Sequence, residues 1–146
     1  MATDTWGTPE SAGTALSTEL NALGNGSYSA ASSAITNGSG TVYKYMALEL
    51  YLASLTPSGT PYIEVYLLPT VDATNYVDGG GATAPPAETL LAVFSLSTSA
   101  STKRRAVSNL LIPPFDFKLV LKNASGVSLA ASGSTLKYRR YSGSVA

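Results

Sequence analysis

The stretch TVYKYMALELYLASL, residues 41–55, and the stretch TPSGTPYIEVYLLP, residues 56–69, decide the fold class of this chain. In the first stretch, methionine and leucine occupy every second position from residue 46, a period typical of a β-strand with one buried face. TPSGTP opens the second stretch and has the proline and glycine content of a turn. The alternation then resumes and places Ile63, Val65 and Leu67 on the face that we expect to be buried. The sequence therefore predicts two amphipathic strands separated by a turn.

The rest of the chain repeats this pattern, with turns 8–12 residues apart. Seven short strands in such spacing, without alternating amphipathic helices, favour an antiparallel sandwich or barrel over an α/β fold. We predict an all-β protein with an antiparallel β-sandwich that is jelly-roll-like. The five further strands that we expect are TLLAVFSLSTS (89–99), KRRAVSNLLIP (103–113), FDFKLVLKN (115–123), VSLAAS (127–132) and TLKYRRYS (135–142).

The first 40 residues are the least regular part of the chain. Leu16, Leu20 and Leu23 have helical spacing, which predicts a short helix, although an extended arm fits the pattern almost as well. We therefore divide the chain into an N-terminal arm or partly ordered segment, residues 1–40, and a β-sandwich domain, residues 41–146. We expect the arm to become ordered on binding, with Trp6 buried against its own subunit or a neighbour.

Composition argues against several classes of chemistry. The chain has no cysteine and no histidine, so it lacks the commonest general base, the thiolate nucleophile and the commonest metal ligands. We predict that the protein is not an enzyme and needs neither a cofactor nor a metal. No apolar run approaches the roughly 20 residues of a membrane span, and the N-terminus lacks the pattern of a secretory signal, so no membrane partner is expected.

The long segment 70–88 suggests a ligand site, because Asp72 and Asp78 precede three glycines. An EF-hand loop requires glycine at its sixth position and glutamate at its twelfth, and this segment has Val77 and Thr83 there. We interpret Thr70–Gly81 as a long flexible loop that forms a subunit contact, with an irregular cation site built from oxygen ligands as the alternative.

Two carbohydrate-related alternatives rest on side chains that point outward by strand parity. Glu49 and Glu64 would resemble a glycosidase carboxylate pair if their strands were neighbours. A row of outward tyrosines could instead stack on sugars or contact another protein. These tyrosines are Tyr43, Tyr45, Tyr51, Tyr62 and Tyr66.

Charge is unevenly distributed along a chain that contains nine basic and nine acidic residues. Almost all acids precede residue 103 and almost all bases follow it, although the bases lie in predicted strands and not in a free tail. We expect folding to interleave the two halves, with no nucleic-acid partner; two oppositely charged faces that meet between subunits are the alternative. The basic clusters are Lys103, Arg104 and Arg105, and Arg139 and Arg140.

Four segments, PYIEVYLLPTVDATNY, LLAVFSLSTS, KRRAVSNLLIPPFDFKLVLKN and LAASGSTLKYRRYS, resemble small virion proteins encoded among the structural genes of tailed bacteriophages. The resemblance extends over residues 41–142 and implies a capsid decoration (cement) protein on the virion surface. It would bridge subunits of the major capsid protein, with copies of itself in a homotrimer. A tail or baseplate subunit and a carbohydrate-binding module are the alternatives. The partner-binding residues that we predict are Trp6, Asp72, Tyr76, Asp78, Lys103, Arg104, Arg105, Arg139, Arg140 and Tyr141.

Overall fold

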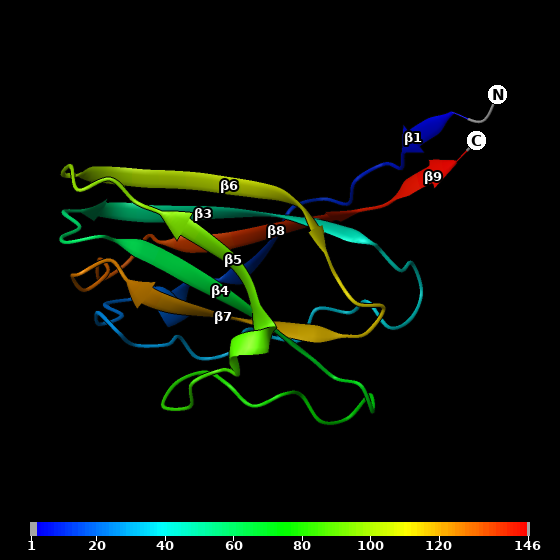
Figure 1. Ribbon diagram of the computed structural model, residues 1–146, viewed down its shortest axis with the longest axis horizontal. Coiled ribbons are helices and arrows are strands. Elements are labelled where there is room, and N and C mark those ends of the chain that lie inside the picture. The colour runs from blue at the N-terminus through cyan, green and yellow to red at the C-terminus, as the bar shows by residue number, and fades with distance from the viewer. Residues whose placement is uncertain (1–2, 146) are drawn as a thin grey trace.

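The computed structural model describes residues 3–145 and consists of two antiparallel sheets packed face to face (Figure 1). One sheet has the strand order β2-β8-β3-β6 and the other has β5-β4-β7. The predicted all-β, antiparallel sandwich is thereby confirmed, whereas its jelly-roll topology stays a prediction. The strands of the sandwich are β2 (Gly13–Leu16), β3 (Tyr45–Leu55), β4 (Tyr62–Pro69), β5 (Leu90–Ser95), β6 (Ser101–Leu111), β7 (Phe117–Ala124) and β8 (Thr135–Tyr141). The remaining elements are β1 (Asp4–Trp6), β9 (Gly143–Val145) and the 3-10 turns η1 (Thr18–Leu20) and η2 (Ala87–Thr89).

The core lies between the two sheets and is formed by the faces that strand parity predicts. Leu48 and Leu50 of β3 and Ile63 and Val65 of β4 are at most 1% exposed. The turn between β3 and β4 carries the chain from one sheet to the other, because β3 pairs with β6 and β8 while β4 pairs with β5 and β7. The two strands that decide the fold class therefore face each other across the core.

The three-stranded sheet is also covered on its outer face. Tyr66, Leu68 and Val120 point away from the main core but are at most 7% exposed, because side chains from two other segments pack on them. Tyr28 comes from the N-terminal segment and Val77 from the loop after β4. Both irregular segments therefore act as a partial third layer over this sheet.

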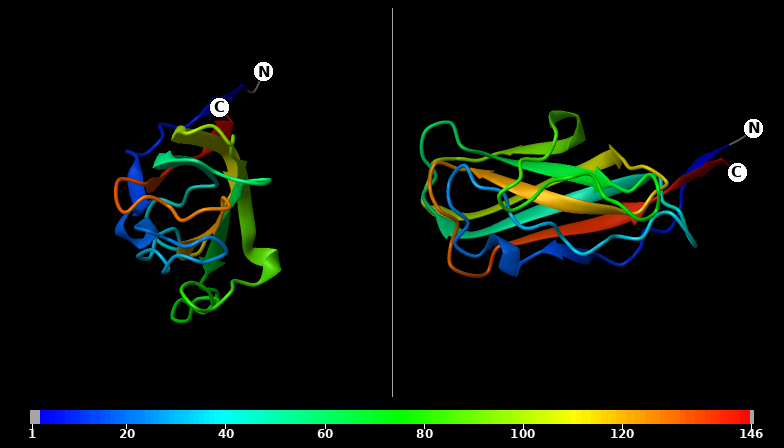
Figure 2. Two further views of the ribbon diagram at one scale, coloured as in Figure 1. Left: turned by 90° about the vertical axis from the view of Figure 1, so that its left-hand side faces the viewer. Right: turned by 90° about the horizontal axis from the view of Figure 1, so that it is seen from below.

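Most of the N-terminal segment is part of the fold. Strand β2 pairs with β8, and the fully buried side chains of Leu16 and Leu20 close one end of the core. The helical spacing of the leucines produces only the single turn η1, because Leu16 belongs to a strand. The boundary at residue 40 thus marks a change in regularity, and residues 13–37 pack along the sandwich (Figure 2).

Residues 26–37 cover the open edge of β7 with a hydrogen-bond pattern that depends on serine. Ser29 N donates to Leu121 O at 2.8 Å, and Ser29 Oγ accepts from Leu121 N at 3.0 Å. Ser32 forms the same pair of bonds with Leu119, at 2.9 Å each. The two serines are three residues apart in the N-terminal segment, whereas their partners are two residues apart on β7. A regular neighbouring strand would match the two-residue spacing and would accept the N–H groups of β7 with backbone carbonyls. Here the serine hydroxyls accept them instead.

The segment VSLAAS, residues 127–132, is not the strand that we predicted. It is a loop in which Leu129 alone is a large buried side chain. Its backbone bonds to the N-terminal segment, with Leu129 N donating to Leu23 O at 2.9 Å and Ala22 N donating to Ala130 O at 2.9 Å. Its short side chains offer too little apolar area to hold a strand on the sheet, so it closes the end of the core instead.

Replacement of Ser32 by Ala tests the serine edge. The substitution leaves the buried Leu119 N–H without its acceptor, which should cost about 1–3 kcal/mol of unfolding free energy. Urea denaturation followed by far-UV circular dichroism measures this change. Ser33→Ala is the matched control, because Ser33 is exposed and should leave stability within about 0.5 kcal/mol of the parent.

Candidate interaction surface

The end of the sandwich from which β1 and β9 project combines most of the unusual surface features of the molecule (Figure 1). Strand β3 begins there and strand β6 ends there, as the pairing of Tyr45 with Leu111 shows. Strands β1 and β9 pair with each other and with no other strand, and they leave the body side by side.

An aromatic cluster of Trp6, Tyr45 and Tyr141 joins this projection to the body. The Trp6 ring meets the Tyr45 ring at 5.9 Å and the Tyr141 ring at 5.4 Å, both edge to face, and the two tyrosines stack at 5.8 Å. The Tyr141 hydroxyl accepts from Asn109 N at 2.7 Å and donates to Asn109 Oδ1 at 2.8 Å. The body therefore positions the tyrosines, yet Trp6 remains 64% exposed.

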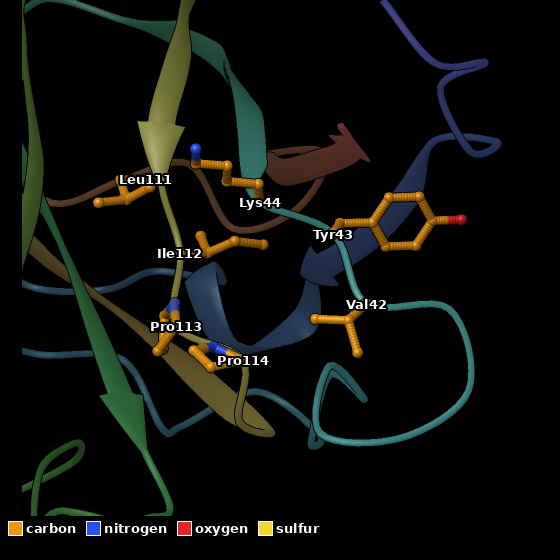
Figure 3. A pocket seen from close by; sticks show the side chains of 7 residues that line it. All are labelled: Val42, Tyr43, Lys44, Leu111, Ile112, Pro113 and Pro114. Carbon is orange, nitrogen blue, oxygen red and sulfur yellow. The ribbon is translucent and has the colours of Figure 1, made fainter. Parts of the chain in front are cut away.

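An apolar hollow of about 530 Å³ lies at the same end. Leu111, 66% exposed, and Val42, 45% exposed, are part of its lining, and Lys44 supplies its only charged side chain. In Figure 3, Val42 and Ile112 face each other across it. The full lining is Val42, Tyr43, Lys44, Leu111, Ile112, Pro113 and Pro114.

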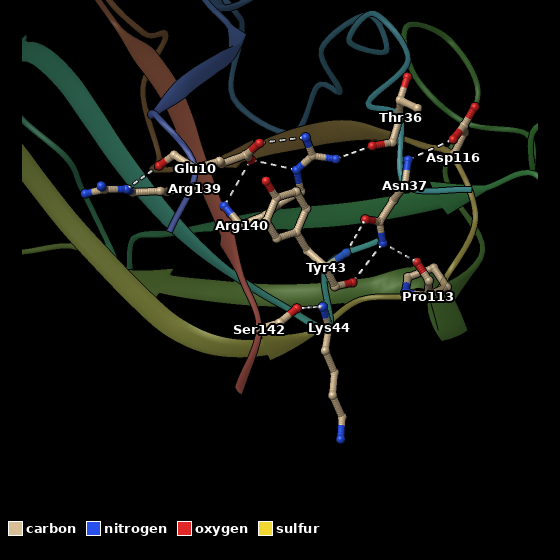
Figure 4. Close-up of polar contacts among 10 residues, drawn as sticks. All are labelled: Glu10, Thr36, Asn37, Tyr43, Lys44, Pro113, Asp116, Arg139, Arg140 and Ser142. Atoms are coloured by element: carbon tan, nitrogen blue, oxygen red, sulfur yellow. Dashed lines mark hydrogen bonds and ion pairs between the residues drawn. The ribbon is translucent and has the colours of Figure 1, made fainter. Parts of the chain in front are cut away.

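A buried amide holds the two walls of the hollow together. The side chain of Asn37, which is fully buried, donates to Tyr43 O at 3.0 Å and to Pro113 O at 2.7 Å, and it accepts from Tyr43 N at 2.9 Å. Asp116 Oδ1 in turn accepts from the backbone N–H of Asn37 at 2.8 Å (Figure 4) and from that of Gly38 at 2.8 Å. Every polar atom of the Asn37 side chain is used, so the hollow is a preformed feature.

Arg140 forms a second link between the N-terminal segment and β8. Its guanidinium donates to both carboxylate oxygens of Glu10, at 2.6 and 2.7 Å, and to Thr36 O (Figure 4). The Tyr43 ring lies 4.9 Å from it and the Tyr138 ring 5.7 Å. The hydrogen bonds that Arg140 donates to the Glu10 carboxylate raise the pKa of Arg140 above its ordinary value. Arg140, which we predicted to bind a partner, is thus engaged within its own chain.

Lys103 is a correction to the predicted partner-binding residues. It is only 2% exposed, and its ammonium group donates to Ser97 Oγ, Ser99 O and Ser101 Oγ. The loop after β5 wraps around this side chain, so Lys103 cannot contact a partner.

The other predicted basic residues remain at the surface but do not form one cluster. Arg104 pairs with Glu49 at 2.6 Å and stacks on Tyr51 at 4.9 Å. Tyr51 lies towards the far end of β3 from Tyr45 and the aromatic cluster. Arg105 Nε donates to Ser95 O at 3.1 Å, and Arg139 Nε donates to a backbone carbonyl at 2.6 Å. The structure therefore separates Arg104 and Arg105 from Tyr141.

Ion pairs confirm the expectation that folding interleaves the two oppositely charged halves of the chain. Within residues 3–145, each of three such pairs joins an acid before residue 103 to a base after it. They are Glu10 with Arg140, Glu49 with Arg104, and Glu64 with Lys122.

The loop after β4 is anchored and not the flexible connection that we predicted. The Asp72 carboxylate accepts from Asn75 N at 2.6 Å, Asn75 Nδ2 at 2.8 Å and Thr74 N at 2.8 Å, which holds the pKa of Asp72 well below its usual range. Gly81 N donates to Ser29 O at 2.8 Å. Gly80, at φ +100°, lies so close to the N-terminal segment that a Cβ there would approach a backbone nitrogen to 2.9 Å. Packing against residues 29–31 thus fixes the loop.

The predicted contact residues of this loop occupy different environments. The ammonium of Lys118 lies 4.5 Å from the centre of the Tyr76 ring, and Asp78 is exposed. Within residues 3–145, no three acidic, histidine or cysteine side chains come together as a metal site.

Glu49 and Glu64 do not form the glycosidase pair that we considered, because β3 and β4 belong to different sheets. Glu64 accepts from the Tyr66 hydroxyl at 2.6 Å, and burial raises the pKa of Tyr66 above its usual range. The burial of Tyr66 also removes one member of the proposed tyrosine row.

No family model matches this chain, and no curated protein matches it significantly. The helical segments within residues 3–145 are single 3-10 turns, and none has the length or apolarity to cross a membrane.

Sequence reasoning missed the hollow, Asn37 and Glu10. The one local signal for the hollow is the run Leu111, Ile112, Pro113 and Pro114, in which prolines end a strand just after large apolar residues. The bonds of Asn37 to Pro113 and of Glu10 to Arg140 span 76 and 130 positions, so no local pattern predicts them.

Alanine variants of two neighbouring arginines test whether Arg140 has a structural role. Arg140→Ala removes the bonds to Glu10 and Thr36 and should lower the free energy of unfolding by about 2 kcal/mol. Arg139→Ala removes only the exposed bond from Nε to Glu10 O and should change it by less than about 1 kcal/mol. Chemical denaturation of both variants measures the difference, and equal values would contradict the structural role of Arg140.

Asp72 should make loop stability depend on pH. Its pKa is lower in the folded protein than the unfolded value of about 3.9, so its contribution is present above that value and is lost as the pH falls through the folded pKa. Asp72→Asn should therefore lower the urea midpoint at pH 7, and its difference from the parent should shrink progressively below about pH 4. Asp78→Asn is the control and should leave the midpoint unchanged at pH 7, since Asp78 is exposed and forms no ion pair within residues 3–145.

Proposed function

We propose that this protein is a structural virion protein of a tailed bacteriophage that decorates the capsid surface and stabilises it by bridging subunits of the major capsid protein. The sequence resemblance suggests this class. The observation that carries the proposal is the apolar end of the sandwich, where the aromatic cluster and the hollow combine on a preformed body.

Exposed apolar side chains at this end provide the area that a contact protein needs. Trp6 and Leu111 are each more than 60% exposed, and Val42 and Phe115 are 45% and 37% exposed. Burial of a tryptophan-sized area of about 200 Å² contributes about 5 kcal/mol before the cost of association. Repetition of such a contact over a capsid lattice multiplies its effect on the shell.

The rest of the molecule supports a role in contact and not in chemistry. Within the described part of the chain, every buried side-chain nitrogen or oxygen has a hydrogen-bond partner. Within residues 3–145, ion pairs engage three of the nine acids and three of the nine bases of the chain with one another. At the end from which β1 and β9 project, the sandwich exposes apolar surface of a defined shape. We propose the major capsid protein and further copies of this chain, in a homotrimer, as the partners.

Among the alternatives, a tail or baseplate subunit would use the same surface, and the particle that the protein binds distinguishes the two roles. A carbohydrate-binding module is less well supported. Sugar stacking requires an open ring face, whereas Trp6 meets Tyr45 and Tyr141 edge to face and these two tyrosines stack on each other.

Binding to phage particles that lack this protein tests the proposal. Purified protein should bind the heads of the phage that encodes it, and cryo-electron microscopy should show density between capsomers. Leu111→Lys places a charge beside the hollow and should reduce occupancy at least tenfold. Val93→Lys, at a 53% exposed position on β5, is the matched control and should bind as the parent does.

Binding to tails but not heads would replace decoration by the tail role. Absence of binding to either particle would contradict the proposal, as would equal occupancy for Leu111→Lys and the parent.

A further inference from the structure

The pair of strands β1 and β9, residues 4–6 and 143–145, forms a terminal ribbon without a core of its own. All three residues of β1 are exposed. The ribbon projects away from the sandwich (Figure 1), and its ring contacts with the body are those of Trp6 with Tyr45 and Tyr141. An isolated two-stranded pair is marginally stable in water, so additional burial of Trp6 would stabilise the ribbon.

The hollow at the same end of the sandwich remains open to such a side chain. Its lining comes from residues 42–44 and 111–114, and the ribbon contributes nothing to it. At about 530 Å³ it has room for an indole ring, and its walls are proline, valine, leucine and isoleucine side chains around Lys44. Every molecule therefore presents both an exposed tryptophan on a projection and an apolar hollow that its own projection leaves empty.

Charge complementarity identifies the occupant. Asp4 lies two positions before Trp6 on β1, so both side chains project from the same face of the ribbon, about 7 Å apart along the strand. Asp4 forms no ion pair within residues 3–145. Lys44 likewise lacks a carboxylate partner there, and its ammonium lies 5.5 Å from the Tyr45 ring. A ribbon that places Trp6 in a hollow brings an unpaired acid toward an unpaired base.

We infer that the terminal ribbon of a second copy of this chain occupies the hollow, with Trp6 among its apolar side chains and Asp4 against Lys44. The donor and the acceptor are different patches of one molecule, so copies join by exchange of ribbons in a pair or by a head-to-tail ring. The inference rests on the proposed function only for the purpose of self-association, which is to link copies on the capsid surface. The contact itself can be tested with the purified protein alone.

Trp6 is the only tryptophan of the chain, so its fluorescence reports the contact directly. Its emission maximum should move to shorter wavelength as protein concentration rises, in parallel with an increase in mass measured by analytical ultracentrifugation. Leu111→Lys should abolish both changes, whereas Val93→Lys should retain them. A parent protein that stays monomeric at concentrations of several hundred micromolar would overturn the inference.

A charge exchange tests the predicted pairing of residues. Asp4→Lys and Lys44→Asp should each weaken self-association at least tenfold, since each opposes two like charges. The double variant restores opposite charges and should recover most of the affinity, which general loss of folding would not do. Single variants that associate like the parent, or a double variant that fails to recover, would overturn the pairing.

Mixture of two defective variants tests the donor and acceptor roles. Trp6→Ala retains a hollow without a donor, and Leu111→Lys retains a donor without a receptive hollow. Each alone should be monomeric, while their mixture should form a one-to-one dimer that does not grow further. A mixture that remains monomeric would refute the contact.

Head binding provides the comparison with the proposed function. If the parent self-associates as described but binds neither heads nor tails, the virion role fails and the contact between copies stands. If the protein binds heads, but either stays monomeric in solution or self-associates equally well in the variants above, the ribbon contact fails and the virion role stands.

Discussion

The outer edge of β7 needs hydrogen-bond partners, and much of the rest of the structure depends on how the N-terminal segment supplies them. Ser29 and Ser32 use their hydroxyl groups to complete pairs with Leu121 and Leu119 that backbone geometry alone could not complete. This arrangement lets a segment of small residues follow a strand that it could not join as a regular neighbour.

The course of this segment determines the environment of the interaction surface. Once residues 26–35 lie along β7, the next residues reach the end of the sandwich, where Asn37 links Tyr43 to Pro113 and Thr36 accepts from Arg140. The same segment covers Tyr66 with Tyr28 and anchors the loop after β4 through Ser29. The contact of the N-terminal segment with β7 therefore positions the walls of the hollow, Arg140 and the loop after β4.

The functional interpretation follows from what remains after these internal contacts are made. Arg140 and Lys103 stood out in the sequence as exposed bases, but the fold satisfies both within the chain. Trp6 and Leu111 are different, because the body leaves each of them mostly in contact with solvent. A molecule whose buried polar groups are paired internally, and which exposes Trp6 and Leu111 at one end, is suited to association at that end, and our proposals concern it.

Much of the sandwich could be predicted from local pattern, and little of the interaction surface could. The alternation in β3 and β4 identified the buried faces of Leu50 and Ile63, because side-chain direction in a strand depends only on parity. The same argument wrongly predicted a strand at residues 127–132. The small residues there follow the alternation but lack the apolar area that holds a strand on a sheet.

The sequence by itself determined the all-β class, the core faces of the main strands and the scarcity of catalytic side chains, because these properties depend on residue type and spacing along a few neighbouring positions. Only the tertiary structure decided that β3 and β4 lie in different sheets, that Lys103 is enclosed, and that Trp6 and the hollow share one end of the molecule. Those outcomes depend on pairings between distant parts of the chain, such as Glu10 with Arg140 and Asn37 with Pro113. The free energy of such pairings comes from the packed whole, and a local window of sequence does not contain it.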